Sequence, residues 1–322
     1  MRSQASRLSS RQSVYAALAG NLLVAITKGI AAAITGSSAM LSEAVHSFVD
    51  SGNEVLLLYG QKRAARPPDA EHPLGYGREL YFWSFVVALL IFALGAGVSI
   101  YEGVLHIRNP HSISDPTINY IVLALAFVFE GASWVVAIRQ FRASHGDRNF
   151  YEAFRRSKDP PSFMVLFEDS AALLGILFAA AGTFVSSTLD MPAFDGVASI
   201  LIGLILAAVA TLLARESKSL LIGEPAEPDF VDSICHISTQ VRGVVGANDV
   251  LTSYLSPDQV VVFLSLEFED TLRVPELEER VKEIERRVKA KHPEVLSLFI
   301  KPQTPQTYRE AESERRRSGE EE

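Results

Sequence analysis

A histidine and an aspartate four residues apart, His46 and Asp50, are the pair in this sequence with the clearest chemistry. On a helix, residues four apart project from successive turns of the same face. An imidazole nitrogen and a carboxylate oxygen can then converge on one ion, and divalent metals accept both kinds of donor. The spacing therefore predicts half of a metal site.

The segment around this pair carries a stripe of further polar residues. Glu43, Asn53 and Glu54 continue the three- and four-residue spacing within SSAMLSEAVHSFVDSGNEVLLLYG. We expect the two glutamates to be helix-end or access-path groups, with metal ligation as the alternative. Asn53 fits a hydrogen bonder between helices.

A second group of charges falls in other apolar stretches. Glu168 and Asp169 are adjacent in PPSFMVLFEDSAALLG. Because neighbouring helix positions differ by about 100°, one carboxylate should face the ion and the other an adjacent helix or water. Lys28 and Glu130 are predicted to form a structural ion pair, with a proton path through Glu130 as the alternative.

Apolar stretches long enough to position these residues in a bilayer recur along the chain. A spanning helix needs roughly 20 mostly apolar residues, and 48% of the 322 residues are hydrophobic. Six stretches qualify, at about 14–34, 37–60, 81–104, 119–138, 163–186 and 194–213. The sequence therefore predicts an α-helical membrane protein with a six-helix transmembrane domain over residues 13–222, after a short N-terminal segment, 1–12.

Lysine and arginine residues predict the orientation of these helices. One set of connections contains nearly all of them: Arg2, Arg7, Arg11, Lys62, Arg63, Arg66, Arg78, Arg139, Arg142, Arg148, Arg155, Arg156, Lys158, Arg215 and Lys218. The opposite set contains essentially Arg108. Basic connections tend to stay in the cytoplasm. We therefore expect a multi-pass protein of the cell (inner) membrane with both termini cytoplasmic.

The remainder of the chain has the composition of a soluble domain. Helices at about 228–241 and 275–291 and strands at about 248–256, 259–268 and 294–300 give an αββαβ order within residues 223–303. Two helices on one face of a sheet leave the other face free for dimerisation. The charge-dense segment 304–322 is predicted to be disordered. The net charge of −8 argues against a nucleic acid partner.

Several phrases of this sequence resemble the cation diffusion facilitator family. They are SSAMLSEAVHSFVDSGN, EHPLGYGRELYFWSF, SIYEGVLHI and FDGVASILIGLILA, and the likeness runs from about residue 12 to 303. VLFEDSAALLG and FEGASW look most like the branch of the animal mitochondrial zinc transporters. The resemblance implies metal/proton antiport by alternating access in a homodimer, and a cytoplasmic ferredoxin-like domain.

The resemblance also implies a central metal site between the second and fifth spans. His46, Asp50 and Asp169 match three of its four positions, and the fourth position is Val165. Glu168, a backbone oxygen or water would have to supply the missing donor.

Two accessory sites of the family are altered in this sequence. In the loop after the second span, Asp69 and His72 match but the third position is Tyr76. Positions that carry metal ligands in some bacterial relatives hold Asn248, Ser265, Lys301 and Gln303 here. Since a charged lysine offers no lone pair, we predict no binuclear site in the cytoplasmic domain.

The sequence predicts efflux of a divalent metal by proton-coupled antiport, with zinc as the substrate that best suits histidine and carboxylates. Manganese, iron(II), cobalt and nickel stay open, as does a non-transporting metal sensor. Metal and protons compete for the same lone pairs, so His46 is the predicted coupling group. No His-Glu-x-x-His motif of a metallohydrolase occurs, and we expect neither an enzyme nor a resident cofactor.

Overall fold

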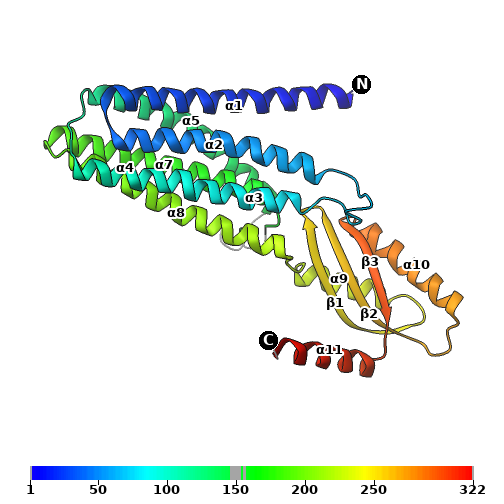
Figure 1. Cartoon of the computed structure of the whole chain (residues 1–322). Helices are drawn as coiled ribbons and strands as arrows, with labels where there is room; N and C mark the ends of the chain where they lie inside the picture. Colours follow the sequence, from blue (N-terminus) through cyan, green and yellow to red (C-terminus); the bar gives the residue numbers. More distant parts are fainter. Residues whose placement is uncertain (1, 146–153, 155–156, 321–322) are drawn as a thin grey trace. The chain divides into compact units, whose positions relative to one another are not determined.

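Long helices make up the first part of the computed structural model, which describes residues 2–145, 154 and 157–320. In chain order the helical segments are α1 (Arg2–Thr35), α2 (Ser38–Ala64), α3 (Glu79–Leu90), the π-helical η1 (Ile91–Ala96), α4 (Gly97–Arg108), α5 (Pro116–His145), α7 (Pro160–Thr188) and α8 (Ala193–Ile222). They run alongside one another as a bundle (Figure 1). Of the basic residues used to predict orientation, Arg148, Arg155 and Arg156 lie outside the described residues.

Five helical stretches are long and apolar enough to cross a membrane. They are Leu18–Thr35, Glu79–Arg108, Pro116–Ala143, Pro160–Thr188 and Ala193–Ile222. The predicted second span is also a long helix, α2, but it carries many polar residues and is not among these five. The prediction of a multi-pass helical membrane protein is therefore confirmed, and the spanning role of α2 stays a prediction.

Small residues let the bundle helices approach closely. Built on Gly103 of α4, a Cβ atom would lie 2.6 Å from the carbonyl oxygen of Gly196 in α8, and one on Gly196 would lie 2.7 Å from that of Gly103. Close backbone contact of this kind replaces the hydrophobic driving force that lipid cannot supply between helices. The apolar core of the bundle includes Met40, Ile91 and Leu206.

The last part of the chain forms the predicted αββαβ domain. Its elements are α9 (Pro228–Thr239), β1 (Val244–Ser256), β2 (Gln259–Phe268), α10 (Val274–Lys291) and β3 (Val295–Pro302). The sheet order is β1-β2-β3, with β1 and β2 antiparallel and β2 and β3 parallel. Alternate residues of β2, among them Val262 and Leu264, join Ile234 of α9 and Ile284 of α10 in the core.

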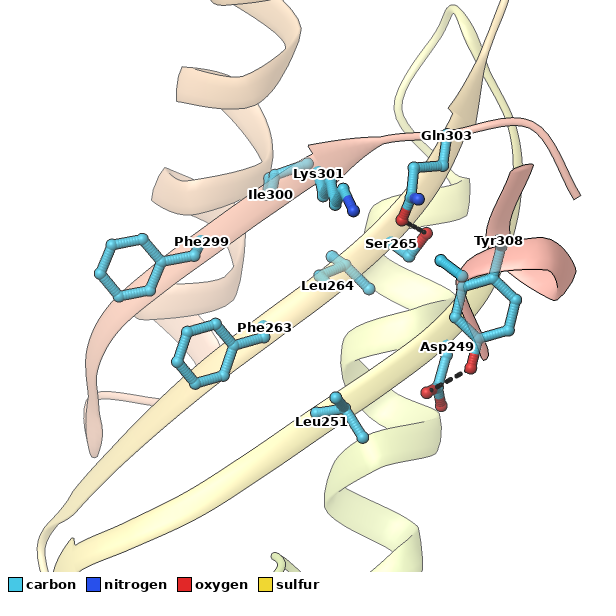
Figure 2. Close-up of a pocket in the computed structure, with 11 residues that line it drawn as sticks. Asp249, Leu251, Phe263, Leu264, Ser265, Phe299, Ile300, Lys301, Gln303 and Tyr308 are labelled. Atoms are coloured by element: carbon cyan, nitrogen blue, oxygen red, sulfur yellow. Dashed lines mark hydrogen bonds between the residues drawn. The ribbon is translucent and has the colours of Figure 1, made fainter. Parts of the chain in front are cut away.

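The other face of this sheet is uncovered over part of its length. Leu251, Phe263 and Phe299 project from the three strands (Figure 2), and each is about half exposed. The rings of Phe263 and Phe299 stack with centroids 5.3 Å apart. Together with residues at the end of the sheet they line a groove of about 260 Å³. This free face is the surface that the sequence predicted for dimerisation.

The predicted disordered tail is wrong for most of its length, since residues Pro305–Glu320 form a helix, α11. Two contacts hold its start. The Thr304 hydroxyl accepts a hydrogen bond from the Thr307 amide at 3.3 Å, and the Tyr308 hydroxyl donates to Asp249 of β1 at 2.7 Å (Figure 2). A high density of charge did not prevent a helix because these side chains anchor its first turn.

The loop 68–78, predicted within the membrane domain, groups instead with residues 219–322 in one compact unit. The Arg78 guanidinium donates to the Ser253 hydroxyl at 3.2 Å. A Cβ on Gly77 would lie 2.8 Å from the carbonyl oxygen of Leu255. Contact with β1 therefore places this loop in the C-terminal unit, although it connects two helices of the bundle.

Candidate metal centre

Helix α2 places His46 and Asp50 together inside the bundle. His46 Nδ1 lies 3.4 Å from Asp50 Oδ1, with 1% of the histidine side chain and 18% of the aspartate side chain exposed. Neither nitrogen of His46, nor Oδ1 of Asp50, has a hydrogen-bond partner in the part of the chain that the structure describes. An unpaired buried polar atom costs roughly 1–3 kcal/mol. One imidazole nitrogen and the neighbouring carboxylate oxygen can therefore serve as two donors to one ion.

The adjacent acids of α7 diverge, as their positions on the helix predict. Glu168 is buried and accepts a hydrogen bond at 3.0 Å from Asn53 on α2. Asp169 accepts one at 2.8 Å from the Ser133 hydroxyl on α5. The predicted role of Asn53 as a hydrogen bonder between helices is confirmed. Ser133 carried no signal in the sequence beyond its place in the fourth span.

The four predicted ligands lie near enough to influence one another electrostatically, but they do not surround one common point. The carboxylates that act electrostatically on Asp50 are those of Glu168, Glu130 and Asp169. Among the described residues, no three histidine, cysteine or acidic side chains are placed to hold a metal ion. The structure thus brings His46 and Asp50 together, while Glu168 and Asp169 each have another partner.

Lys28 of α1 lies beside this group and is fully buried. Its ammonium lies 3.7 Å from the predicted partner Glu130. Two closer partners come from α2, the Glu43 carboxylate at 3.0 Å and the Ser47 hydroxyl at 2.8 Å. The predicted ion pair exists, but Glu43 is the nearer acid, so its role at this point in α2 is to bind Lys28.

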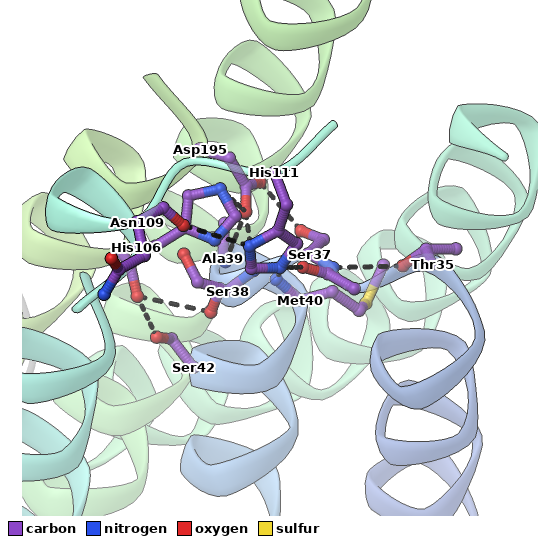
Figure 3. A network of polar contacts seen from close by, with 12 residues as sticks. Thr35, Ser37, Ser38, Ala39, Met40, Ser42, His106, Asn109, His111 and Asp195 are labelled. Atoms are coloured by element: carbon purple, nitrogen blue, oxygen red, sulfur yellow. Dashed lines mark hydrogen bonds and ion pairs between the residues drawn. The ribbon is translucent and has the colours of Figure 1, made fainter. Parts of the chain in front are cut away.

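The start of α2 is fixed by a residue that the sequence analysis missed. Asp195, at the start of α8, accepts hydrogen bonds from the Ser37 hydroxyl at 2.7 Å and from the amides of Ser38 and Ala39 at 2.5 and 3.3 Å (Figure 3). His106 Nε2 lies 3.9 Å from the same carboxylate. An acid near the N-terminal amides of a helix stabilises it. The only sequence signal was an acid in the first turn of an apolar helix.

Comparison with known proteins decides the family. The cation efflux transmembrane domain matches residues 14–222, and the cytoplasmic domain of cation efflux proteins matches residues 226–302. The chain belongs to the cation efflux family. The expected resemblance is therefore confirmed for both parts of this cation efflux protein.

Curated relatives of this cation efflux protein include proteins named as zinc antiporters and one named as a metal tolerance protein. The mitochondrial proton-coupled zinc antiporter SLC30A9 of Xenopus laevis is 33% identical over 258 residues, which are 80% of this chain and 46% of the relative. The SLC30A9 protein of Homo sapiens is 30% identical over 89% of this chain and 51% of its own length. Metal tolerance protein C4 of Arabidopsis thaliana is 34% identical over 70% and 50%. The chain spans about half the length of these relatives.

In the loop that matches the family's accessory site, the carboxylate of Asp69 already accepts hydrogen bonds. Asp69 accepts hydrogen bonds from the Tyr76 hydroxyl at 2.6 Å and from the amides of His72 and Glu71. The bond from Tyr76, helped by those amides, holds the pKa of the Asp69 carboxyl below its usual value. The His72 and Tyr76 rings pack with centroids 4.2 Å apart. Tyr76 thus occupies, with a hydrogen bond, the place of a third donor.

Three of the four altered positions in the cytoplasmic domain bind one another. Asn248 donates to the Ser265 hydroxyl at 3.1 Å and to the carbonyl oxygen of Gln303 at 2.9 Å. Ser265 in turn donates to the Gln303 side-chain oxygen at 3.1 Å (Figure 2). This neutral network uses the polar atoms that metal ligands would present.

Proposed function

We propose that this cation efflux protein moves a divalent metal ion, zinc by preference, across a membrane in exchange for protons. The supporting observation is the buried pair His46 and Asp50, which has polar atoms without hydrogen-bond partners among the described residues and lies among further carboxylates. Buried ionisable groups in a membrane bundle usually mark an ion path. Imidazole and carboxylate donors suit zinc, and the zinc antiporters named above support that choice.

The ion would bind to His46 and Asp50 and be joined by Asp169 and Glu168. Each acid would keep its hydrogen bond from Ser133 or Asn53 on one carboxylate oxygen and turn the other oxygen to the ion. Small rotations of α5 or α7 about those hydrogen bonds would therefore change the number of donors around the ion. This supports alternating access, because the same step that completes the site also changes the contacts between the helices.

Protons would take the place of the metal on the same donors. The site has several carboxylates near one lysine, so its negative charge must be offset by a cation, either the metal or protons. His46 remains the proposed coupling group, and the carboxylates share that role. Exchange of one divalent ion for protons then follows from competition for the same lone pairs.

The basic connections support an orientation with both termini in the cytoplasm. We retain the cell (inner) membrane as the location, although the animal relatives are named as mitochondrial. The exposed sheet face with Leu251, Phe263 and Phe299 supports a homodimer formed by the C-terminal unit. The match to a family of transporters supports a role in transport instead of catalysis.

Metal flux into proteoliposomes with an imposed pH gradient tests the proposal. We expect zinc flux in the parent and losses of about a hundredfold or more in His46→Ala, Asp50→Ala and Asp169→Ala, because each removes a ligand. His236→Ala is the matched control, since His236 is an exposed histidine of the C-terminal unit. Undiminished flux in all three site variants would rule out the site.

Two comparisons sharpen the result. Manganese and iron(II) in place of zinc would show the selectivity, and Glu168→Gln against Asp169→Asn would show which acid completes the site. Metal binding that depends on His46 without any flux would favour the alternative of a membrane metal sensor.

A further inference from the structure

A lysine is buried in the membrane bundle with its ammonium fully surrounded by acceptors. Lys28 Nζ lies 2.8 Å from Ser47 Oγ, 3.0 Å from Glu43 Oε2 and 3.7 Å from Glu130 Oε1. These acceptors come from α2 and α5, while the lysine belongs to α1. The three donors of an ammonium group are thereby matched by three oxygens. The charge is fixed in place instead of reaching water.

The position of this charge relates it to the metal donors. Glu43, His46, Ser47 and Asp50 follow the i, i+3, i+4, i+7 spacing of one helix face, so the partners of Lys28 share a stripe with the donor pair. The charge of Lys28 acts on both His46 and Asp50. Among the side chains that the structure describes, Lys28 is the only lysine or arginine that is buried.

Acidic side chains around the site outnumber basic ones. Five acids act on Lys28 or on Asp50: Glu43, Asp50, Glu130, Glu168 and Asp169. One lysine cannot neutralise them all, so the site still attracts a cation. It attracts that cation less strongly than it would without Lys28, because a fixed positive charge repels an incoming positive ion.

We propose that Lys28 is a fixed internal cation that weakens metal binding at His46 and Asp50 and thereby speeds release. The inference rests on the proposed transport function. A site along a transport path has to bind its ion well enough to load it and weakly enough to let it leave. Lys28 sets this balance through its charge and touches no metal donor in the structure, so it acts as an affinity-setting residue.

Metal affinity in a set of charge variants tests the inference. Zinc dissociation constants are measured on the purified full chain in detergent against a competing chelator, and zinc flux is measured in proteoliposomes. Lys28→Met, which removes the charge at similar length, should bind zinc about tenfold tighter or more, since a divalent ion then meets no fixed repulsion. Its maximal flux should fall because release is slower.

Three further variants separate charge from structure. Lys28→Arg keeps the positive charge in a bulkier group, and the folded variant should stay within about threefold of the parent affinity. Glu43→Gln removes a negative charge and should weaken binding, while Lys28→Met with Glu43→Gln restores the charge balance and should return the affinity close to that of the parent. A purely structural lysine would instead give variants whose thermal stability falls while zinc affinity stays constant.

The outcomes that overturn the inference are definite. Unchanged or weaker zinc binding in Lys28→Met contradicts it, and so does an affinity of the double variant more than tenfold from that of the parent. Should Lys28→Met fail to fold, the double variant and Lys28→Gln give the same comparison. Failure of the proposed function is distinct, because there His46→Ala would leave zinc affinity and flux as in the parent.

Discussion

Two polar clusters on helix α2 differ in how their buried atoms are used. At its start, both oxygens of the Asp195 carboxylate accept hydrogen bonds from the Ser37 hydroxyl and from the first backbone amides of the helix. Two to three turns further along, His46 and Asp50 keep three polar atoms without partners among the described residues. The first cluster stabilises the fold, and the second lowers stability in exchange for a place to bind a ligand.

The sharpest way to break this comparison is to make the central site apolar. His46→Leu should reduce zinc flux by about a hundredfold or more, because a ligand is lost. In the metal-free protein its unfolding temperature should be unchanged or higher, since two unpaired nitrogens are removed. Thermal unfolding with and without zinc measures both effects, and zinc should stabilise only the parent.

A large loss of stability in metal-free His46→Leu would contradict the comparison. It would mean that the imidazole supports the bundle in the way that Asp195 does. His106→Leu gives the parallel comparison at the start of the helix, since His106 is a buried histidine whose Nε2 lies 3.9 Å from Asp195 and has no hydrogen-bond partner among the described residues.

The opposite change tests the cluster at the start of the helix. Asp195→Ala removes the acceptor of three hydrogen bonds, two of them from backbone amides, and should cost about 2–4 kcal/mol of unfolding free energy. Zinc affinity of the folded protein should stay within about threefold, because no donor is removed. Unfolding in detergent and a zinc titration check the two parts.

Asp195→Asn gives the graded version of this experiment. An amide oxygen still accepts one or two of the hydrogen bonds, so the loss should be smaller than in Asp195→Ala. Equal losses in the two variants would show that the charge of Asp195 matters more than the hydrogen bonds it accepts.

The packing behind Lys28 predicts a smaller effect. A Cβ on Gly175 of α7 would overlap Oε1 of Glu43, the acid that binds Lys28. Gly175→Ala should therefore destabilise the protein by about 1–3 kcal/mol. Gly131→Ala on α5 is the matched control, because its Cβ would make only an ordinary contact 3.9 Å from Leu173. If Gly131→Ala destabilised the protein by the same amount, the contact with Glu43 would not be the cause of the effect of Gly175→Ala.

The elements of the fold were predictable because their patterns are periodic and local. The spans follow from runs of apolar residues, and the αββαβ order follows from alternation in β2 and the apolar stripe of α10. The π-helical segment Ile91–Ala96 inside the third span has no such signal. The helix at Pro305–Glu320 was missed because composition cannot reveal a tertiary contact such as that between Tyr308 and Asp249.

The sequence was enough to predict which residues belong to the candidate site, but not which partners each of them contacts. His46 and Asp50 follow from spacing along one helix, which fixes their relative position. The partners of Glu168 and Asp169 depend on which helices lie beside α7, and this is a tertiary property. Asp195 was missed for the same reason, since its hydrogen bonds join residues more than 150 positions apart in the chain.

The smallest expected effect concerns the polar network of the C-terminal unit. Asn248 donates two hydrogen bonds, to Ser265 and Gln303, and in this resembles the Asp195 carboxylate, whose two oxygens both accept hydrogen bonds. Asn248→Ala should cost about 1 kcal/mol of unfolding free energy. It should leave the number of zinc ions bound per chain unchanged, because a network of neutral side chains that pair with one another offers no vacant donor.

Equilibrium dialysis against zinc measures that number in parent and variant. A fall in the number bound would show that paired polar atoms can also serve as ligands, and the distinction between the two clusters of α2 would then no longer predict which of them binds metal.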